Sequence, residues 1–188
     1  MNEKRTPERQ KRGMVLWLTG LPASGKSVLA DKLYDYLSEQ GYRVERLDGD
    51  ALRAAFPSTG FDREERMRHI RRAGEMAAQF EREGAVVVAS FISPYRESRE
   101  YVRSICSHFV EIFVKASLEE CERRDPKGLF KKARSGEIKN LTGLDDPYEE
   151  PEHFELVIDT EKHTIEQSFA QLKGFVDDLL SSRKSSTT

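Results

Sequence analysis

Cysteine is scarce in this chain, which has only Cys106 and Cys121 among its 188 residues. Two cysteines are too few for a disulfide framework, and their spacing matches no C-x-x-C metal or redox motif. Both lie among apolar neighbours in segments with a helical pattern, so we expect buried structural thiols. A chain whose thiols stay reduced is expected in the cytoplasm.

Long hydrophobic runs and an excess of one charge are also missing. No apolar run approaches the ~18 residues of a membrane-spanning helix, and the net charge is −2. Neither a membrane nor nucleic acid is therefore an expected partner. Residues 1–12 are charged and have no apolar core, unlike a secretory signal, so we expect a flexible arm there.

The residues that are present suit one globular domain. Hydrophobic residues make up 37% of the chain and charged residues 34%, and a chain of this length can bury roughly 70% of its unfolded surface. We expect a single domain over residues 13–180 and a disordered tail over residues 181–188.

Residues 20–27, GLPASGKS, fit the pattern G-x-x-x-x-G-K-[ST] of a phosphate-binding P-loop. Its glycines let consecutive backbone N–H groups turn around an anion. Lys26 would reach the β- and γ-phosphates of ATP, and Ser27 would bind Mg²⁺. An apolar run precedes the motif and a helical pattern follows it, as the motif requires. We expect an ATP site formed by Gly20, Leu21, Pro22, Ala23, Ser24, Gly25, Lys26, Ser27 and Val28.

Short apolar runs alternate with helical patterns along the chain. Strands are predicted at 14–19, 43–47, 85–90, 110–114 and 156–158, and helices at 26–40, 64–83, 95–106, 118–124 and 165–180. This alternation predicts an α/β fold of the P-loop NTPase type, a five-stranded parallel sheet with helices on both faces. Ligands of such sheets bind beyond the carboxyl ends of the strands.

Residues 125–151 interrupt the alternation. The segment is rich in Lys, Gly and Asp and is longer than an ordinary connection. We predict a lid loop that closes over the substrates. A mobile surface insertion is the alternative.

Two carboxylates, Asp48 and Asp50, follow the second predicted strand in the run LDGD. At the carboxyl edge of the sheet they would face the P-loop. A kinase needs one carboxylate to hold Mg²⁺ or its water shell and another to orient or deprotonate the acceptor hydroxyl. We assign Asp48 to the metal and Asp50 to the hydroxyl. A turn with a helix N-cap at Asp50 is the alternative, and both can hold together.

Arginines and a serine follow the next elements. The guanidinium groups of Arg53, Arg66 and Arg71 suit phosphate or sulfate oxygens, and we expect at least one of them to touch an anionic substrate. A solvated helix face is the alternative for any single arginine. Pro94 at the start of a predicted helix places Ser93 at the N-cap, beside the predicted phosphate site.

Seven segments, in this order, resemble the motifs of adenylylsulfate kinases. They are residues 20–27, 47–50, 70–75 (IRRAGE), 91–96 (FISPYR), 121–129 (CERRDPKGL), 131–139 (KKARSGEIK) and 142–149 (TGLDDPYE). The resemblance covers residues 13–180. It implies ATP-dependent phosphorylation of the ribose 3′-hydroxyl of adenosine 5′-phosphosulfate to 3′-phosphoadenosine 5′-phosphosulfate and ADP, in sulfate assimilation, with Mg²⁺. It also implies a homodimer.

The resemblance carries the family's residue roles to matching positions. Lys26, Asp48, Asp50 and Ser93 would be catalytic, Ser93 standing at the family's phosphoserine position, although direct in-line transfer needs no covalent relay. Arg124 would lie against the ATP base, and Ser27 and Asp48 would serve Mg²⁺. The acceptor would be bound by Asp50, Arg53, Phe61, Arg66, His69, Ile92, Ser93, Lys127 and Leu141, with Phe61 stacked on its base.

Three positions depart from the family pattern. Ala51 and His69 stand where the family has asparagine, and Leu141 replaces the phenylalanine of an aromatic clamp on the acceptor base. Leucine keeps an apolar contact but loses base stacking, which is worth about 1–3 kcal/mol. The alternative function is therefore a kinase of the same fold acting on another nucleotide 5′-derivative, such as a cytidine conjugate. A nucleotide-binding regulatory protein without transfer activity is disfavoured by the intact Lys26 and Asp50.

Overall fold

The sheet is built from five parallel strands in the order β2-β3-β1-β4-β5. The structure, a computed structural model, describes residues 13–56 and 60–185. The strands are β1 (Met14–Thr19), β2 (Val44–Asp48), β3 (Val86–Ser90), β4 (Phe109–Lys115) and β5 (Leu156–Asp159). The predicted five-stranded parallel sheet is confirmed. All six residues of β1 are buried, as expected for a central strand that is covered on both faces.

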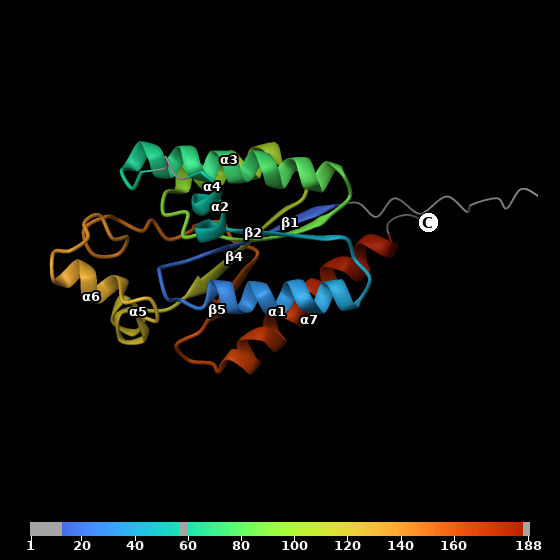
Figure 1. The fold of residues 1–188 in the computed structure, drawn as a ribbon. Helices are drawn as coiled ribbons and strands as arrows, with labels where there is room; N and C mark the ends of the chain where they lie inside the picture. The colour runs from blue at the N-terminus through green and yellow to red at the C-terminus, as the bar shows by residue number, and fades with distance from the viewer. Residues whose placement is uncertain (1–12, 57–59, 186–188) are drawn as a thin grey trace, which may run out of the picture.

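Helices cover both faces of the sheet, as predicted (Figure 1). One face carries α1 (Lys26–Glu39) and α7 (Ile165–Ser185), and the other carries α3 (Arg63–Arg82) and α4 (Arg96–Ile105). The alternating side chains of β1 enter two separate cores, Leu16 and Leu18 on the α1 side and Val15 and Trp17 on the α3 side. None of the helices in the described ranges has the length and apolar character needed to span a membrane.

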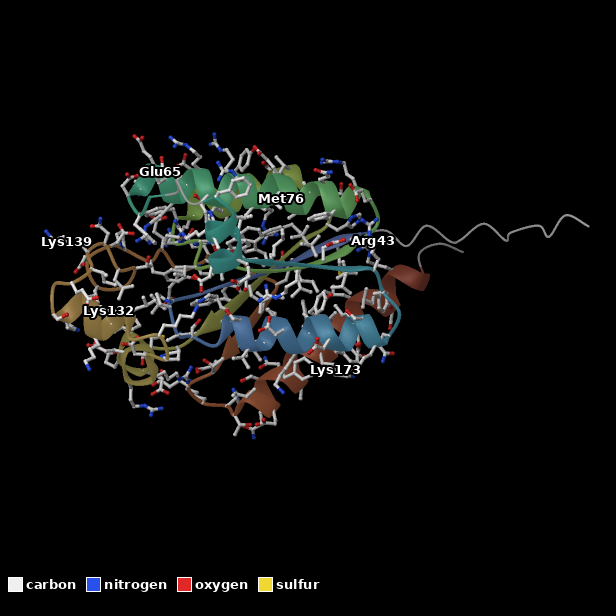
Figure 2. The ribbon with its side chains drawn as sticks, in the orientation of Figure 1. Arg43, Glu65, Met76, Lys132, Lys139 and Lys173 are labelled. Carbon is white, nitrogen blue, oxygen red and sulfur yellow. The ribbon has the colours of Figure 1, made fainter. Side chains whose placement is uncertain are left out.

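Three short helices lie at the carboxyl edge of the sheet. They are α2 (Gly49–Ala55), α5 (Leu118–Arg124) and α6 (Leu129–Arg134), of which only α5 is predicted from the sequence. The helix α6 belongs to the predicted lid and lies beside α5 in Figure 1. The apolar side chains of α5 and α6 form a third, smaller cluster around Cys121, Phe130 and Leu141, whereas Leu52 of α2 packs in the core on the α3 side. The lid segment, in which Lys132 and Lys139 are labelled in Figure 2, is therefore partly folded rather than a plain loop.

Two expectations about segment ends are corrected. The helix α7 continues to Ser185, so residues 181–185, expected in a disordered tail, are helical. The helix after β3 begins at Arg96 with Tyr95 as its N-cap, so Ser93 does not cap it. The predicted arm, residues 1–12, and residues 186–188 lie outside the described residues.

Both cysteines are free thiols, as expected from their number. Cys121 is buried and Cys106 is half-buried. Burial raises the pKa of the Cys106 thiol to about 12, so it stays protonated and unreactive near neutral pH.

Candidate functional site

A cleft of about 640 Å³ lies at the carboxyl edge of the sheet. Its walls come from the P-loop after β1, the turns after β2 and β3, the segment after β5, and the start of the lid. Among the predicted site residues, it is lined by Pro22, Ala23, Gly25, Lys26, Ser27, Val28, Asp48, Asp50, Arg53, Arg66, His69, Ile92, Ser93, Arg124 and Lys127. The fold thus brings together residues as far apart in the sequence as Pro22 and Ser168, as expected for a ligand site beyond the carboxyl ends of parallel strands.

The P-loop depends on two glycines. A Cβ on Gly20 would lie 2.3 Å from the backbone oxygen of Val114, and Gly25 has φ 100, which favours glycine. Lys26 follows at the start of α1 and is buried, with its Nζ donating to the Leu21 carbonyl at 2.5 Å. The loop therefore packs tightly on β4 and directs Lys26 inward.

Burial lowers the pKa of Lys26 to about 7, and the nearby Cys121, Asp48 and Asp50 oppose the shift. A buried ammonium without a full set of anionic partners loses its proton easily. The site is therefore suited to an anion that supplies the missing negative charge. Ser27 is exposed beside it in the first turn of α1.

Asp48 ends β2 and has both carboxylate oxygens engaged. Its Oδ1 accepts from the backbone N–H groups of Asp50 and Ala51, so Asp48 is the N-cap of α2 and Asp50 is not. Its Oδ2 accepts from the Ser90 hydroxyl at 2.9 Å and lies 3.5 Å from the Arg46 guanidinium. Partial burial alone would raise the pKa of Asp48, but these hydrogen bonds and Arg46 lower it. Asp48 is therefore a fixed, charged carboxylate.

Sequence reasoning missed the two residues that hold this carboxylate. Arg46 also donates to the Ser90 hydroxyl at 2.8 Å, so both form one hydrogen-bonded group with Asp48. Asp48 and Ser90 are register partners in the parallel pair β2–β3. A predicted register would have revealed Ser90, because parallel strands end at the same edge.

Asp50 is exposed at the start of α2, with a side chain that is 73% accessible. It forms an ion pair with Lys127 of the lid. This hydrogen bond raises the pKa of Lys127. One lid residue and one strand-end carboxylate therefore meet inside the cleft.

Ser93 follows β3 in an unusual conformation. Its φ is 41, in the left-handed region, and its side chain is buried. The hydroxyl donates to Thr19 Oγ1 at 2.8 Å and accepts from Trp17 Nε1 at 3.2 Å. The hydroxyl is therefore bound to β1 rather than to the first turn of α4, which explains why Ser93 is not the cap.

The arginines predicted to bind an anion have different surroundings. Arg53 lines the cleft, donates to the Gly60 carbonyl at 2.9 Å and lies 4.6 Å from the centre of the Phe61 ring. Arg71 is exposed and stacks on Tyr101 at 4.7 Å outside the cleft lining. Arg71 therefore belongs to a solvated helix face, which was the alternative for any single arginine.

Arg66 joins α3 to the lid. Its guanidinium is buried and donates to the Thr142 hydroxyl and the Asn140 carbonyl, and it lies 3.5 Å from Asp146. Its Nε donates to the Phe61 carbonyl at 2.7 Å. Arg66 therefore lines the cleft while it anchors residues 140–146.

His69 is buried next to Phe91, with the rings 5.8 Å apart and nearly edge-on. Within the described ranges, neither of its ring nitrogens has a hydrogen-bond partner. Burial, together with the charges of Arg53 and Arg72, lowers the pKa of His69 to about 4. His69 is therefore a neutral imidazole in the cleft wall at physiological pH.

Two predicted acceptor residues do not line the cleft. Phe61 is 60% exposed and stacks on Arg53, and Leu141 is buried in the cluster with Cys121 and Phe130. Neither is among the lining residues. The structure therefore does not place an aromatic pair at these two positions in the cleft.

The opposite end of the cleft lies over β1, β4 and β5. Arg124 lines it and donates to the Thr160 side chain at 3.0 Å and backbone oxygen at 2.6 Å. Thr160 in turn donates to the Ser24 carbonyl at 2.8 Å. Ile165 and Ser168 of α7 also line this end, and the Ser168 hydroxyl is buried without a partner in the described structure. Sequence reasoning missed these three residues, although the end of β5 signals the position of Thr160.

The chain is similar to known proteins over most of its length. Residues 12–159 match the family model of adenylylsulphate kinase. A protein of Aeropyrum pernix named "probable adenylyl-sulfate kinase" is 52% identical over 171 residues, which cover 88% of this chain and 93% of the relative. The adenylyl-sulfate kinase of Staphylococcus carnosus is 46% identical over 178 residues, covering 91% and 89%.

A solved structure is similar over nearly the same length. The Mycobacterium tuberculosis APS kinase CysC in complex with AMPPNP and APS superposes with a TM-score of 0.82 and 36% identity. The match covers 88% of this chain and 98% of that one.

Proposed function

The chain belongs to the adenylylsulphate kinase family, and we propose that it transfers the γ-phosphoryl group of ATP to the ribose 3′-hydroxyl of adenosine 5′-phosphosulfate. The observation that carries the proposal is the meeting of Lys26 with Asp48 and Asp50 in one cleft. Phosphoryl transfer depends on positioning and on charge stabilisation, and these three groups can supply both.

The two ends of the cleft suit two substrates. The P-loop, Arg124 and Thr160 lie over β1, β4 and β5, where the phosphates and base of ATP would bind. Asp50, Arg53 and the turn after β3 lie over β2 and β3, where the acceptor would bind. The transferred group would then pass between the ends, close to Lys26.

Asp50 is the residue we assign to the acceptor hydroxyl. It is exposed to the cleft, whereas Asp48 is held by the helix cap and by Ser90. The Ser93 hydroxyl is engaged with Thr19 and Trp17. That engagement favours direct in-line transfer over a relay through Ser93.

The residues present fit Mg²⁺, which prefers oxygen ligands and keeps part of its water shell. The Ser27 hydroxyl and the charged Asp48 carboxylate are the oxygen donors that would hold it, directly or through water. Bound there, the ion would neutralise charge on the phosphates.

The acceptor would be recognised mainly by charge and by polar groups in the cleft. Arg53 and Lys127 offer cationic donors for the phosphosulfate, and Arg66 would contribute through the lid that it anchors. His69 and Ile92 would contact the nucleoside. The acceptor base would be held without an aromatic clamp at these two positions, because Phe61 stacks on Arg53 and Leu141 is buried in the third cluster.

The direct test is a coupled assay with ATP, Mg²⁺ and adenosine 5′-phosphosulfate. We expect the 3′-phosphorylated product and ADP, and absence of turnover by folded protein would refute the proposal. The same assay with cytidine 5′-conjugates tests the alternative acceptor. A kcat/KM for adenosine 5′-phosphosulfate at least about tenfold above every other conjugate, a difference of ~1.4 kcal/mol, would exclude it.

Replacement of Asp50 by Asn tests its role at the hydroxyl. We expect kcat to fall by about 10²–10⁴, the usual contribution of a positioned base, while the Kd for ATP stays within about twofold. Glu45→Gln is a matched control, because Glu45 lies on β2 away from the cleft. An Asp50→Asn enzyme with normal kcat would remove Asp50 from the mechanism.

The assembly and compartment are also proposals. We expect a homodimer, which light scattering of the purified protein would test. We expect the reaction in the cytoplasm, where the free thiols of Cys106 and Cys121 stay reduced.

A further inference from the structure

The turn after β3 forms one wall of the cleft and is held in a strained shape. Ile92, Ser93 and Pro94 line the cleft, and Ser93 has φ 41. A residue with a Cβ keeps such a conformation only where its surroundings impose it. The hydroxyl bonds to Trp17 and Thr19 fix the Ser93 side chain, and Thr19 Oγ1 also donates to the Ile92 carbonyl at 2.8 Å. A further group binds the backbone carbonyl of Ser93.

Arg99 of α4 is that group. Its two terminal nitrogens donate to the carbonyl oxygens of Ser93 and Glu149, each at 2.6 Å. Its Nε lies 2.8 Å from the carboxylate of Glu111 on β4. The Arg99 side chain is only 2% exposed and is not among the lining residues. It therefore acts on the cleft through the turn and not by touching a ligand.

A buried ion pair of this kind fixes the orientation of hydrogen-bonding groups more than it stabilises the fold. Two apolar side chains of similar size can often replace such a pair without loss of stability. A guanidinium, by contrast, presents planar donors at fixed angles, which a flexible lysine cannot reproduce. Here that planar group joins three segments, since Glu111 neutralises it while Ser93 and Glu149 accept its hydrogen bonds.

The contact with Glu149 connects the turn to the lid. The Glu149 N–H donates to the Pro94 carbonyl at 2.8 Å, and its carboxylate accepts from the Arg96 N–H at 2.8 Å. Residues 140–146, which Arg66 anchors, come just before it in the chain. Arg99 therefore holds both the turn after β3 and Glu149, which lies at the C-terminal end of the lid; we call this end the C-terminal root of the lid.

We infer that Arg99 is a positioning residue that fixes the Ser93 turn against the C-terminal root of the lid, and so keeps the acceptor end of the cleft in one shape. The turn follows β3, which lies between β2 and β1, on the side of Asp50. The effect should therefore fall on the acceptor and not on ATP. This inference rests on the proposed function where its readout is turnover.

The experiment compares three variants with the wild-type chain. Arg99→Lys keeps a charge opposite Glu111 but loses the planar donors. The double variant Arg99→Met, Glu111→Leu removes both charges, so that no buried ion is left unpaired if the single variant fails to fold. Arg103→Met is the control, because Arg103 binds Glu111 and Glu155 of the same network but does not contact the turn.

The kinetic readout separates the two substrates. Since a displacement of about 1 Å can cost up to ~10²-fold, we expect both Arg99 variants to raise the KM for adenosine 5′-phosphosulfate by about tenfold or more. The KM for ATP should stay within about twofold. Arg103→Met should leave both KM values within about twofold, even where its Tm falls.

Trp17 supplies a second readout that does not require turnover. It is the only tryptophan of the chain, its Nε1 donates to the Ser93 hydroxyl, and its ring stacks on Phe91 at 4.8 Å. We expect its emission spectrum to shift in both folded Arg99 variants and to be unchanged in Arg103→Met.

The outcomes are distinct. A wild-type acceptor KM and an unshifted Trp17 emission in the Arg99 variants would overturn the inference, as would a change confined to Tm. If the wild-type chain does not phosphorylate adenosine 5′-phosphosulfate, the proposed function fails, and the Trp17 emission alone then decides the role of Arg99.

Discussion

At the scale of single residues, His69 is the most unusual feature of the cleft. It is a buried imidazole whose ring nitrogens have no partner within the described ranges, and it lies beside Arg53 and Arg72. A buried polar group without a hydrogen bond costs about 1–3 kcal/mol. Its position in the cleft wall suggests that a substrate group supplies the missing partner.

The lowered pKa of His69 predicts a loss of stability in acid. Between the unfolded value of 6.5 and the folded value of about 4, only the unfolded chain takes up a proton. Folding stability should therefore fall by about 2 kcal/mol from pH 7 to pH 5 through this residue. Urea unfolding at both pH values should show this loss in the wild type and not in His69→Asn. Equal pH dependence of the two proteins would show that His69 titrates normally.

The lowered pKa of Lys26 predicts that nucleotide binding is coupled to proton uptake. With a pKa of about 7, it is mostly uncharged at pH 8 in the free protein, and the phosphates of a nucleotide favour its charged form. Binding of a non-hydrolysable ATP analogue at pH 8 should therefore take up about one proton. Calorimetry in buffers of different ionisation enthalpy measures this number. Lys26→Arg, which stays charged, should take up none, and equal uptake by both would locate the proton elsewhere.

At the scale of elements, the lid has two parts with different attachments. Residues 140–149 are held by the buried side chains of Arg66, Tyr95 and Arg99. Residues 125–139 are attached by Phe130 and its neighbours in the third cluster, and otherwise mainly by exposed ion pairs such as Lys127–Asp50 and Arg134–Glu122. Exposed ion pairs contribute about 0–1 kcal/mol. The N-terminal part should therefore be the mobile half of the lid.

Hydrogen exchange tests this division. We expect ADP with adenosine 5′-phosphosulfate to slow exchange in residues 125–139 by at least about tenfold, because closure excludes water from the transfer site. Residues 140–149 should already be protected in the free protein and change little. The amides of β1 serve as the internal reference, and uniform protection across residues 125–149 would contradict the two-part lid.

At the scale of the whole molecule, the sequence was sufficient to predict those parts of the fold that depend on local patterns of apolar and polar residues. The apolar runs gave all five strands, and the P-loop with Asp48 and Asp50 gave one edge of the cleft, because parallel strands end together. Long-range contacts decided the rest. Leu141 packs with Cys121 and Phe130 under the lid, and Ser93 turns its hydroxyl to Thr19, neither of which periodicity can predict.

The strand order also governs how the molecule is assembled during synthesis. The central strand β1 is made first, yet its partners β3 and β4 begin only at Val86 and Phe109. At about 5–20 residues per second, β1 waits roughly 4–14 s for its first neighbour. The supports of the phosphate loop come later still, since Val114 packs on Gly20 and Thr160 binds Ser24. A nascent chain therefore contains the complete P-loop sequence long before the segments that support this loop are available for nucleotide binding.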